Sequence, residues 1–133
     1  MTSKVIYLGE LRTECEHLQS GNKIITDAPL DNQGKAEAFS PTDTVATALA
    51  SCMFTIMGIK ARDMSLDLQN SYAEVTKTMA SNPRRISKIG IDFYLPSNLG
   101  EKEKLILENA GKTCPVIYSL HADIEKEIKF YYK

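Results

Sequence analysis

A run of residues without charge, from Thr44 to Ile59, constrains the fold of this chain more than any other feature. The run is shorter than the ~20 apolar residues that a helix needs to cross a bilayer, and it is rich in small residues. Ser40 precedes it as the expected N-cap, with Pro41 at the first helical position and Asp43 where the acid of a capping box belongs. We therefore expect an enclosed helix that ends near Lys60–Arg62, and no membrane span.

Small side chains on this expected helix allow another element to approach closely. Ala46, Ala50, Ser51 and Gly58 are the clearest examples. One partner that fits such a helix is the same helix from a second subunit.

Strand patterns lie on both sides of the expected helix, and an amphipathic helix lies between the later ones. The strands are expected at Val5–Leu8, Leu11–His17, Ile24–Ile25, Leu66–Thr78, Ile89–Leu95 and Ile124–Phe130, and the second helix at Glu101–Lys112. A surface loop is expected at Asp27–Ala38 and a turn at Asn82–Arg85. Helices and strands do not alternate regularly, so the pattern indicates a single α+β domain spanning residues 1–133.

Composition excludes several classes of function. With 16 basic and 17 acidic residues, the net charge of -1 offers no attraction for nucleic acid or for an anionic membrane. The first residues, Met1–Tyr7, contain no apolar run of signal-peptide length, and 3 cysteines do not form a disulfide framework. These features favour a reducing, cytoplasmic location. We expect no metal, because there is no cluster of ligands and the two histidines, His17 and His121, are far apart in sequence.

Two cysteines stand in settings that suggest chemistry. Cys52 is in the middle of the apolar helix, where burial disfavours a thiolate and where no cation lies nearby in sequence. Its activator must therefore come from elsewhere in the fold or from another subunit. The alternative is that Cys52 is a packing residue, as free cysteines often are. We interpret the third cysteine, Cys15, as a small core residue of an alternating strand.

Cys114 precedes Pro115, and this order predicts a helix N-cap at the cysteine. A sulfur at that position faces free backbone N–H groups and the positive end of the helix dipole, which favour a thiolate. The alternative is a purely structural Cys-Pro junction. A thiol inside an apolar helix together with a thiol at a helix start is one way to build a peroxide-reducing pair.

The order of several short motifs resembles the OsmC/Ohr family of osmotically induced and organic hydroperoxide resistance proteins. These motifs are Ser40-Pro41-Thr42-Asp43, Ser51-Cys52-Met53 in an Ala-rich helix, Asn82-Pro83-Arg84-Arg85-Ile86 before a strand, and Cys114-Pro115-Val116 with Ser119-Leu120. The resemblance covers nearly the whole chain. It is closer to the general OsmC-like branch than to the hydroperoxide resistance branch.

The resemblance implies an intertwined homodimer in which long central helices pack against antiparallel sheets. It also implies two sites at the subunit interface, where the cysteine matching Cys52 attacks an organic hydroperoxide. The resulting sulfenic acid then condenses with the cysteine matching Cys114. No cofactor is bound, and an external dithiol or lipoyl-type reductant restores both thiols.

The activating residues of the family carry over less closely. An arginine of the N-terminal strands and an acid near the start of the central helix hold the first thiol as a thiolate, and here Arg12 and Asp43 are the candidates. In the hydroperoxide resistance branch a glutamate directly follows the proline, whereas this chain has Thr42 there. Asp43 is one residue later, which rotates it by about 100° around the helix.

The sequence therefore predicts a thiol-dependent peroxidase of the oxidative stress response. Apolar neighbours of the thiol, Met53 and Phe54, suit an organic peroxide better than hydrogen peroxide. Two other functions fit the same residues: a protein that binds a small apolar ligand without catalysis, and a redox sensor that uses the same cysteine pair but turns over slowly.

Overall fold

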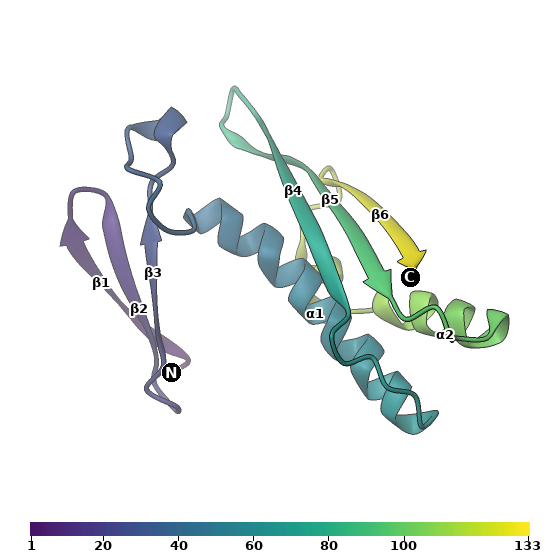
Figure 1. Ribbon diagram of the computed structural model, residues 1–133. Coiled ribbons are helices and arrows are strands. Elements are labelled where there is room, and N and C mark those ends of the chain that lie inside the picture. The colour runs from purple at the N-terminus through teal and green to yellow at the C-terminus, as the bar shows by residue number, and fades with distance from the viewer. The chain divides into compact units, whose positions relative to one another are not determined.

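The computed structural model describes residues 1–133, which divide into two compact units, 1–45 and 46–133 (Figure 1). Each unit is described below by itself. The expectation that they form one domain stays a prediction. The mixture of helices with two three-stranded sheets confirms the expected α+β class.

The first unit is an antiparallel sheet followed by a compact loop. Its strands, in spatial order, are β1 (Ser3–Gly9), β2 (Arg12–His17) and β3 (Lys23–Asp27). The register places Val5 opposite Cys15 and Cys15 opposite Ile24, so these residues share one face. The short helix η1 (Leu30–Asn32) lies within the loop that the sequence predicted.

That loop folds back on itself closely at Gly34. A Cβ atom at this position would lie 1.7 Å from the carbonyl oxygen of Ala28, so only glycine fits there. The backbone N–H groups of Gly34 and Ala36 donate to the carbonyl oxygens of Pro29 and Ala28. The loop therefore has a fixed shape where it leads into the first long helix.

Helix α1 (Pro41–Asp63) begins with the capping box that the sequence predicted. The backbone N–H of Asp43 donates to the Ser40 hydroxyl at 3.0 Å, and the Asp43 carboxylate accepts the Ser40 backbone N–H, also at 3.0 Å. These reciprocal bonds satisfy two donors that a helix start leaves open. They explain why α1 begins where it does.

Only one stripe of α1 is buried within the chain. Its members recur at helical spacing and are Ala46, Leu49, Ala50, Met53, Met57 and Ala61. On other faces of the helix, Val45 and Ile59 are exposed. Within one copy of the chain, α1 is therefore covered along one stripe only, and the expectation that it is enclosed is not met.

In length and hydropathy α1 would suffice to cross a membrane, with 23 residues and a window hydropathy of 1.5. This is weak evidence, because the core helix of a water-soluble protein meets the same criteria. The buried stripe of α1 packs on a sheet in the second unit, as such a core helix does.

The second unit contains a sheet with strand order β4 (Tyr72–Ala80), β5 (Arg85–Leu95) and β6 (Glu125–Tyr132). Strands β4 and β5 form an antiparallel hairpin, but β6 pairs with β5 in parallel. The expectation of purely antiparallel sheets is wrong here. The chain returns through α2 (Glu101–Gly111) and α3 (Pro115–Ser119), and a crossover of this length permits parallel pairing.

The core of the second unit lies between α1 and the inner face of this sheet. Ile89, Ile91 and Phe93 of β5 pack against the α1 stripe, and Cys114 belongs to the same buried cluster. The Phe93 ring meets the edge of Phe54 at 4.9 Å and stacks on Phe130 at 5.2 Å. A second cluster joins Leu107 of α2 to the end of the sheet.

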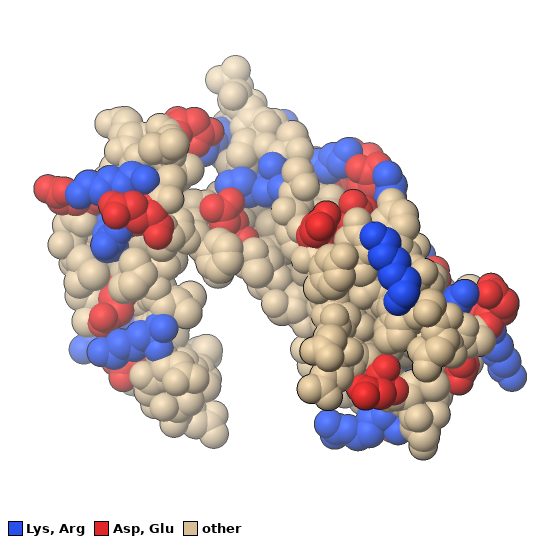
Figure 2. Space-filling view, viewed as in Figure 1, with Lys and Arg blue, Asp and Glu red and all other residues tan.

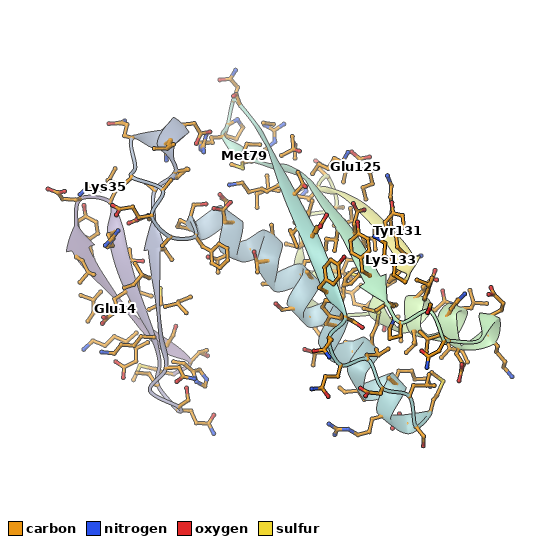
Figure 3. The ribbon with its side chains drawn as sticks, in the orientation of Figure 1. Glu14, Lys35, Met79, Glu125, Tyr131 and Lys133 are labelled. Atoms are coloured by element: carbon orange, nitrogen blue, oxygen red, sulfur yellow. The ribbon has the colours of Figure 1, made fainter.

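The outer face of the sheet is polar and carries a stack of tyrosine rings. Tyr94 stacks between Tyr72 at 4.6 Å and Tyr131 at 5.1 Å, and Figure 3 shows Tyr131 near Lys133 at the end of β6. Lys88 pairs with Glu127 at 2.6 Å on the same sheet. In Figure 2, basic and acidic side chains are interspersed over the visible surface of this unit.

Candidate functional site

The second unit brings Cys52 and Cys114 together. Cys52 comes from the middle of α1, and Cys114 comes from the junction between α2 and α3. Cys114 belongs to the buried cluster that contains Met53 and Phe93, and Cys52 packs against that cluster. Cys52 is near enough to raise the pKa of Cys114. Residues 62 positions apart in the sequence (52 to 114) thus form a neighbouring thiol pair.

Cys114 occupies the N-cap position that its sequence predicted. Pro115 is the first residue of α3, and the backbone N–H of Ile117 donates to the Cys114 sulfur at 3.4 Å. The cap bond fixes the direction of the thiol. It also explains why a cysteine fits at a position where a hydroxyl or carboxylate oxygen is more usual.

The ionisation of Cys114 differs from the expectation that its helix start favours a thiolate. Burial raises the pKa of the Cys114 thiol, and neighbouring Cys52 raises this pKa further. The N–H groups of Ile117 and Val116 act in the opposite direction but do not outweigh burial. The side chain is 0% exposed, which is why burial dominates. Cys114 is therefore held as a neutral thiol.

Cys52 is more accessible than its neighbour. It is partly buried and lies next to Met53, a member of the α1 stripe that is covered by the sheet. Because Cys52 is partly exposed and Cys114 is fully buried, a reagent reaches Cys52 more readily than Cys114. This order of access suits a pair in which the outer thiol reacts first and the inner thiol reacts with the product.

The position of the Cys114 junction depends on a close approach between α1 and the end of α2. A Cβ atom on Gly111 would lie 3.1 Å from Cγ and 3.2 Å from Sδ of Met57. The backbone N–H of Cys114 donates to the carbonyl oxygen of Gly111 at 3.3 Å. Glycine at 111 thus lets the cysteine-bearing junction pack closely on α1.

The apolar residues expected to receive a peroxide do not line an open site. Met53 is fully buried against the sheet, and Phe54 packs on Phe93. Met53 is a core residue, and Phe54 is a partly buried residue that packs against the same core. A preference for an organic peroxide therefore needs support from other residues.

Arg12 lies in the first unit, on β2, and is paired with acidic groups. Its Nε and Nη2 atoms donate to the two carboxylate oxygens of Asp27, at 2.7 and 2.8 Å. The Glu37 carboxylate lies 3.6 Å from Nη2. Arg12 also lowers the pKa of the Asp27 carboxyl, and the bond to Asp27 raises the pKa of Arg12.

Sequence reasoning missed Asp27, which it assigned to the start of a surface loop. Asp27 ends strand β3, is 2% exposed and lies opposite Arg12 in the β2–β3 register. Its carboxylate also accepts the backbone N–H of Glu37 at 3.1 Å. An acid two residues after the apolar run Ile24–Ile25 was the available signal, but its partner becomes apparent only from the strand register.

Asp43 serves as the capping acid of α1, through its bond with Ser40. Along α1, Asp43 and Cys52 are nine positions apart, which is two and a half turns at about 3.6 residues per turn. The two side chains therefore leave opposite sides of the helix. Asp43 also borders an apolar hollow of about 560 Å³ in the first unit, with Ile24, Ile25 and Phe39 among its walls.

No group of three or more His, Cys, Asp or Glu side chains is arranged to hold a metal ion. Cys15 is partly buried on β2, and its sulfur lies 3.8 Å from the Thr13 hydroxyl. It belongs to the first unit, away in sequence from the Cys52–Cys114 pair.

Comparison with known proteins gives a consistent group of relatives. A profile of the family described as OsmC-like protein matches residues 34–129. A structure from Psychrobacter arcticus, named as that of an osmotic stress induced and detoxification response protein, is 56% identical to this chain. That match covers 98% of this chain and 96% of the other, with a TM-score of 0.95. No curated protein matches the chain.

More distant structures share the fold. One is an organic hydroperoxide resistance protein from Legionella pneumophila, 16% identical, with 98% of this chain and 96% of that chain covered and a TM-score of 0.71. Another is an organic hydroperoxide resistance protein from Elizabethkingia anophelis with thiocyanate bound, 11% identical. It covers 100% of this chain and 97% of its own length, with a TM-score of 0.77. At these identities the likeness concerns the fold alone.

Proposed function

Because the chain belongs to the OsmC-like protein family, we propose that it is a cytoplasmic, homodimeric peroxidase that reduces organic hydroperoxides with a pair of thiols. The observation that carries this proposal is the neighbouring Cys52 and Cys114, one accessible and one buried. The names of two fold neighbours, both organic hydroperoxide resistance proteins, point to the same substrate class.

The proposed reaction has three steps. The Cys52 thiolate attacks one oxygen of the hydroperoxide, the O–O bond breaks, and the alkoxide that leaves takes a proton to become an alcohol. Cys52 is then a sulfenic acid, which condenses with the Cys114 thiol to give a disulfide and water. An external dithiol, such as a lipoyl-type reductant, restores both thiols by disulfide exchange.

The uncovered surfaces of the chain support a dimer. Helix α1 is apolar nearly all round, yet only one stripe of it is buried. In the first unit, Val5, Tyr7 and Ile24 lie on one face of the sheet and are exposed. A second copy of the chain would cover such surfaces and remove their apolar area from water.

Arg12 and Asp43 remain the proposed activators of Cys52, acting in the assembled dimer. Arg12 brings a guanidinium whose Nε and Nη2 atoms are held by Asp27, which fixes the direction of the remaining N–H donors. Asp43 is held by Ser40 and leaves α1 on the side opposite to Cys52. We therefore expect Asp43 to help activate the Cys52 thiol of the other subunit and not that of its own.

The test is consumption of cumene hydroperoxide with excess dithiothreitol or dihydrolipoamide. We expect Cys52→Ser to abolish turnover and Cys114→Ser to block recycling after the first oxidation. The matched control is Cys15→Ser, which removes the third thiol and should leave the rate unchanged. Hydrogen peroxide should react more slowly than cumene hydroperoxide. A wild-type rate no higher than that of Cys52→Ser would refute the peroxidase and leave a ligand-binding protein as the better reading.

A further inference from the structure

Gly111 brings the end of α2 against α1. It is the last residue of α2 and is buried. A Cβ atom there would lie 3.1 Å from Cγ and 3.2 Å from Sδ of Met57, and 3.5 Å from Cε of Met53. Both methionines are fully buried in the α1 stripe, and Met53 directly follows Cys52 in the sequence. The backbone of Gly111 therefore lies against the part of α1 that carries Cys52.

A hydrogen-bonded turn joins Gly111 to Cys114. The backbone N–H of Cys114 donates to the carbonyl oxygen of Gly111 at 3.3 Å, and the N–H of Thr113 donates to that of Ala110 at 3.0 Å. The Thr113 hydroxyl also donates to the Ala110 carbonyl oxygen, at 2.7 Å. On the other side, the Cys114 sulfur accepts the backbone N–H of Ile117 at 3.4 Å. Because these bonds hold the chain on both sides of Cys114, a displacement of Gly111 also displaces Cys114.

We propose that Gly111 and Met57 are positioning residues for the disulfide step. Their contact sets how closely Cys114 approaches α1, and therefore how fast Cys114 bonds to Cys52. This role rests on the proposed function. Cys114 shares its buried cluster with Met53 and Met57, and Cys52 packs against that cluster. A disulfide forms only within a narrow range of geometry, with Cβ atoms about 3.5–4.5 Å apart, so a small displacement of the buried thiol slows the bond.

The side chain of Met57 is what makes the missing Cβ at Gly111 important. Carbon atoms in favourable contact lie about 3.5–4.0 Å apart, so Gly111→Ala would bring its Cβ too close to Cγ of Met57, at 3.1 Å. Met57 is 0% exposed and has little free space in the core. Gly111→Ala therefore moves the end of α2 as well as the methionine. Met57→Ala removes both Cγ and Sδ, and so makes room for the new Cβ.

The test follows the attack of Cys114 on a modified Cys52 and needs no peroxide. One equivalent of Ellman's reagent converts the accessible Cys52 thiol to a mixed disulfide and releases one thionitrobenzoate. The Cys114 sulfur then bonds to the Cys52 sulfur, the mixed disulfide breaks, and a second thionitrobenzoate leaves while the Cys114 proton passes to solvent. All proteins carry Cys15→Ser, so the two phases of absorbance report this pair alone.

The proteins compared are the Cys15→Ser parent and the same protein with Gly111→Ala, with Met57→Ala, or with both changes. We expect Gly111→Ala to leave the first phase unchanged and to slow the second about tenfold, since a misplacement of ~1 Å costs roughly a hundredfold. When Met57→Ala is already present, adding Gly111→Ala should leave the second phase nearly unchanged. Gly90→Ala is the matched control, because its Cβ contacts begin at 3.8 Å, and it should alter neither phase.

Two results would overturn the proposal. One is an unchanged second phase in Gly111→Ala. The other is equal slowing by Gly111→Ala with and without the Met57 side chain, because the effect would then not come through that contact. If Gly111→Ala alone does not fold, the Met57→Ala protein with and without Gly111→Ala still decides the question. Nearly equal second phases support the proposal, and a loss of about tenfold overturns it.

The outcomes separate this inference from the proposed function. Peroxide turnover by the parent, with an unchanged second phase in Gly111→Ala, would overturn the positioning role and leave the peroxidase standing. A slow second phase in Gly111→Ala that Met57→Ala restores, in a protein without peroxide turnover, would support the positioning role and refute the peroxidase. A parent that shows no second phase would overturn the positioning role together with the proposed disulfide.

Discussion

Asp27 holds Arg12 through two parallel hydrogen bonds, from Nε at 2.7 Å and from Nη2 at 2.8 Å. The two residues face each other across the β2–β3 ladder, and the carboxylate also accepts the Glu37 backbone N–H. Asp27 thereby joins the sheet of the first unit to the loop that leads into α1. Asp27 is a buried acid whose negative charge is neutralised by the ion pair with Arg12.

This pairing predicts a particular response to acid. Arg12 lowers the pKa of Asp27, so the stabilisation by the pair is complete above the pKa of an unfolded aspartate, about 3.9, and is lost as pH falls through the lower folded value. Asp27→Asn should lower the melting temperature at pH 7. Melting curves of both proteins from pH 2 to pH 8 should converge at the acidic end. A difference that stays constant down to pH 2 would contradict the assignment.

Gly111→Ala should destabilise the protein by about 1 kcal/mol, because the new Cβ crowds Met57 and forces it to shift. The free energy of unfolding, from urea denaturation, is the measurement. Gly90→Ala is the matched control, since a Cβ there meets Thr76 at 3.8 Å and 3.9 Å, an ordinary contact. Equal losses in the two variants would show that the close approach between α1 and α2 is not what requires Gly111.

Ser40→Ala should remove the N-cap of α1 and cost about 1 kcal/mol of stability. Ser40→Thr keeps an acceptor oxygen and should recover most of this loss. Thermal melting followed by circular dichroism measures both. If Ser40→Ala and Ser40→Thr both had the same melting temperature, well below that of the wild type, the loss would not come from the missing cap. It would instead come from changing a side chain that is buried.

Tyr132→Phe tests a hydrogen bond at the end of β6. The Tyr132 hydroxyl donates to the Glu108 carboxylate at 2.5 Å, and burial, followed by this bond, raises the pKa of Tyr132. The wild type should therefore keep this stabilisation below pH ~10, the value for an unfolded tyrosine, and lose it as pH rises further. Phenylalanine should cost about 1 kcal/mol at pH 7 and flatten the alkaline slope. An unchanged slope in melting experiments above pH 9 would count against the bond.

The sequence was sufficient to predict those features whose cause lies within a few neighbouring residues, namely the helix caps. The start of α1 was predicted because Ser40, Pro41 and Asp43 satisfy the helix end among themselves. The N-cap role of Cys114 was predicted for the same reason, from the proline that follows it. A cap depends on neighbours within three residues, which a sequence displays directly.

Features that depend on distant partners were not predicted. The parallel direction of β6 is set by the crossover through α2 and α3, and the pattern of alternating residues is the same in either direction. The ionisation of Cys114 depends on burial among residues of α1 and β5, which outweighs the local effect of the helix start. The partner of Arg12 required the β2–β3 register.

The crossover between β5 and β6 carries Cys114, and this links the thiol pair to the edge of the sheet. Strand β6 pairs with β5 along its whole length, from Glu125 to Tyr132, and thereby holds the far end of the connection in place. Proteins open locally, and edge elements open more readily than the core. When β6 separates from β5, the buried cluster that contains Cys114 loses its contacts with Ile128 and Phe130. The rate at which Cys114 reacts with an added thiol reagent therefore measures how often β6 separates from the sheet.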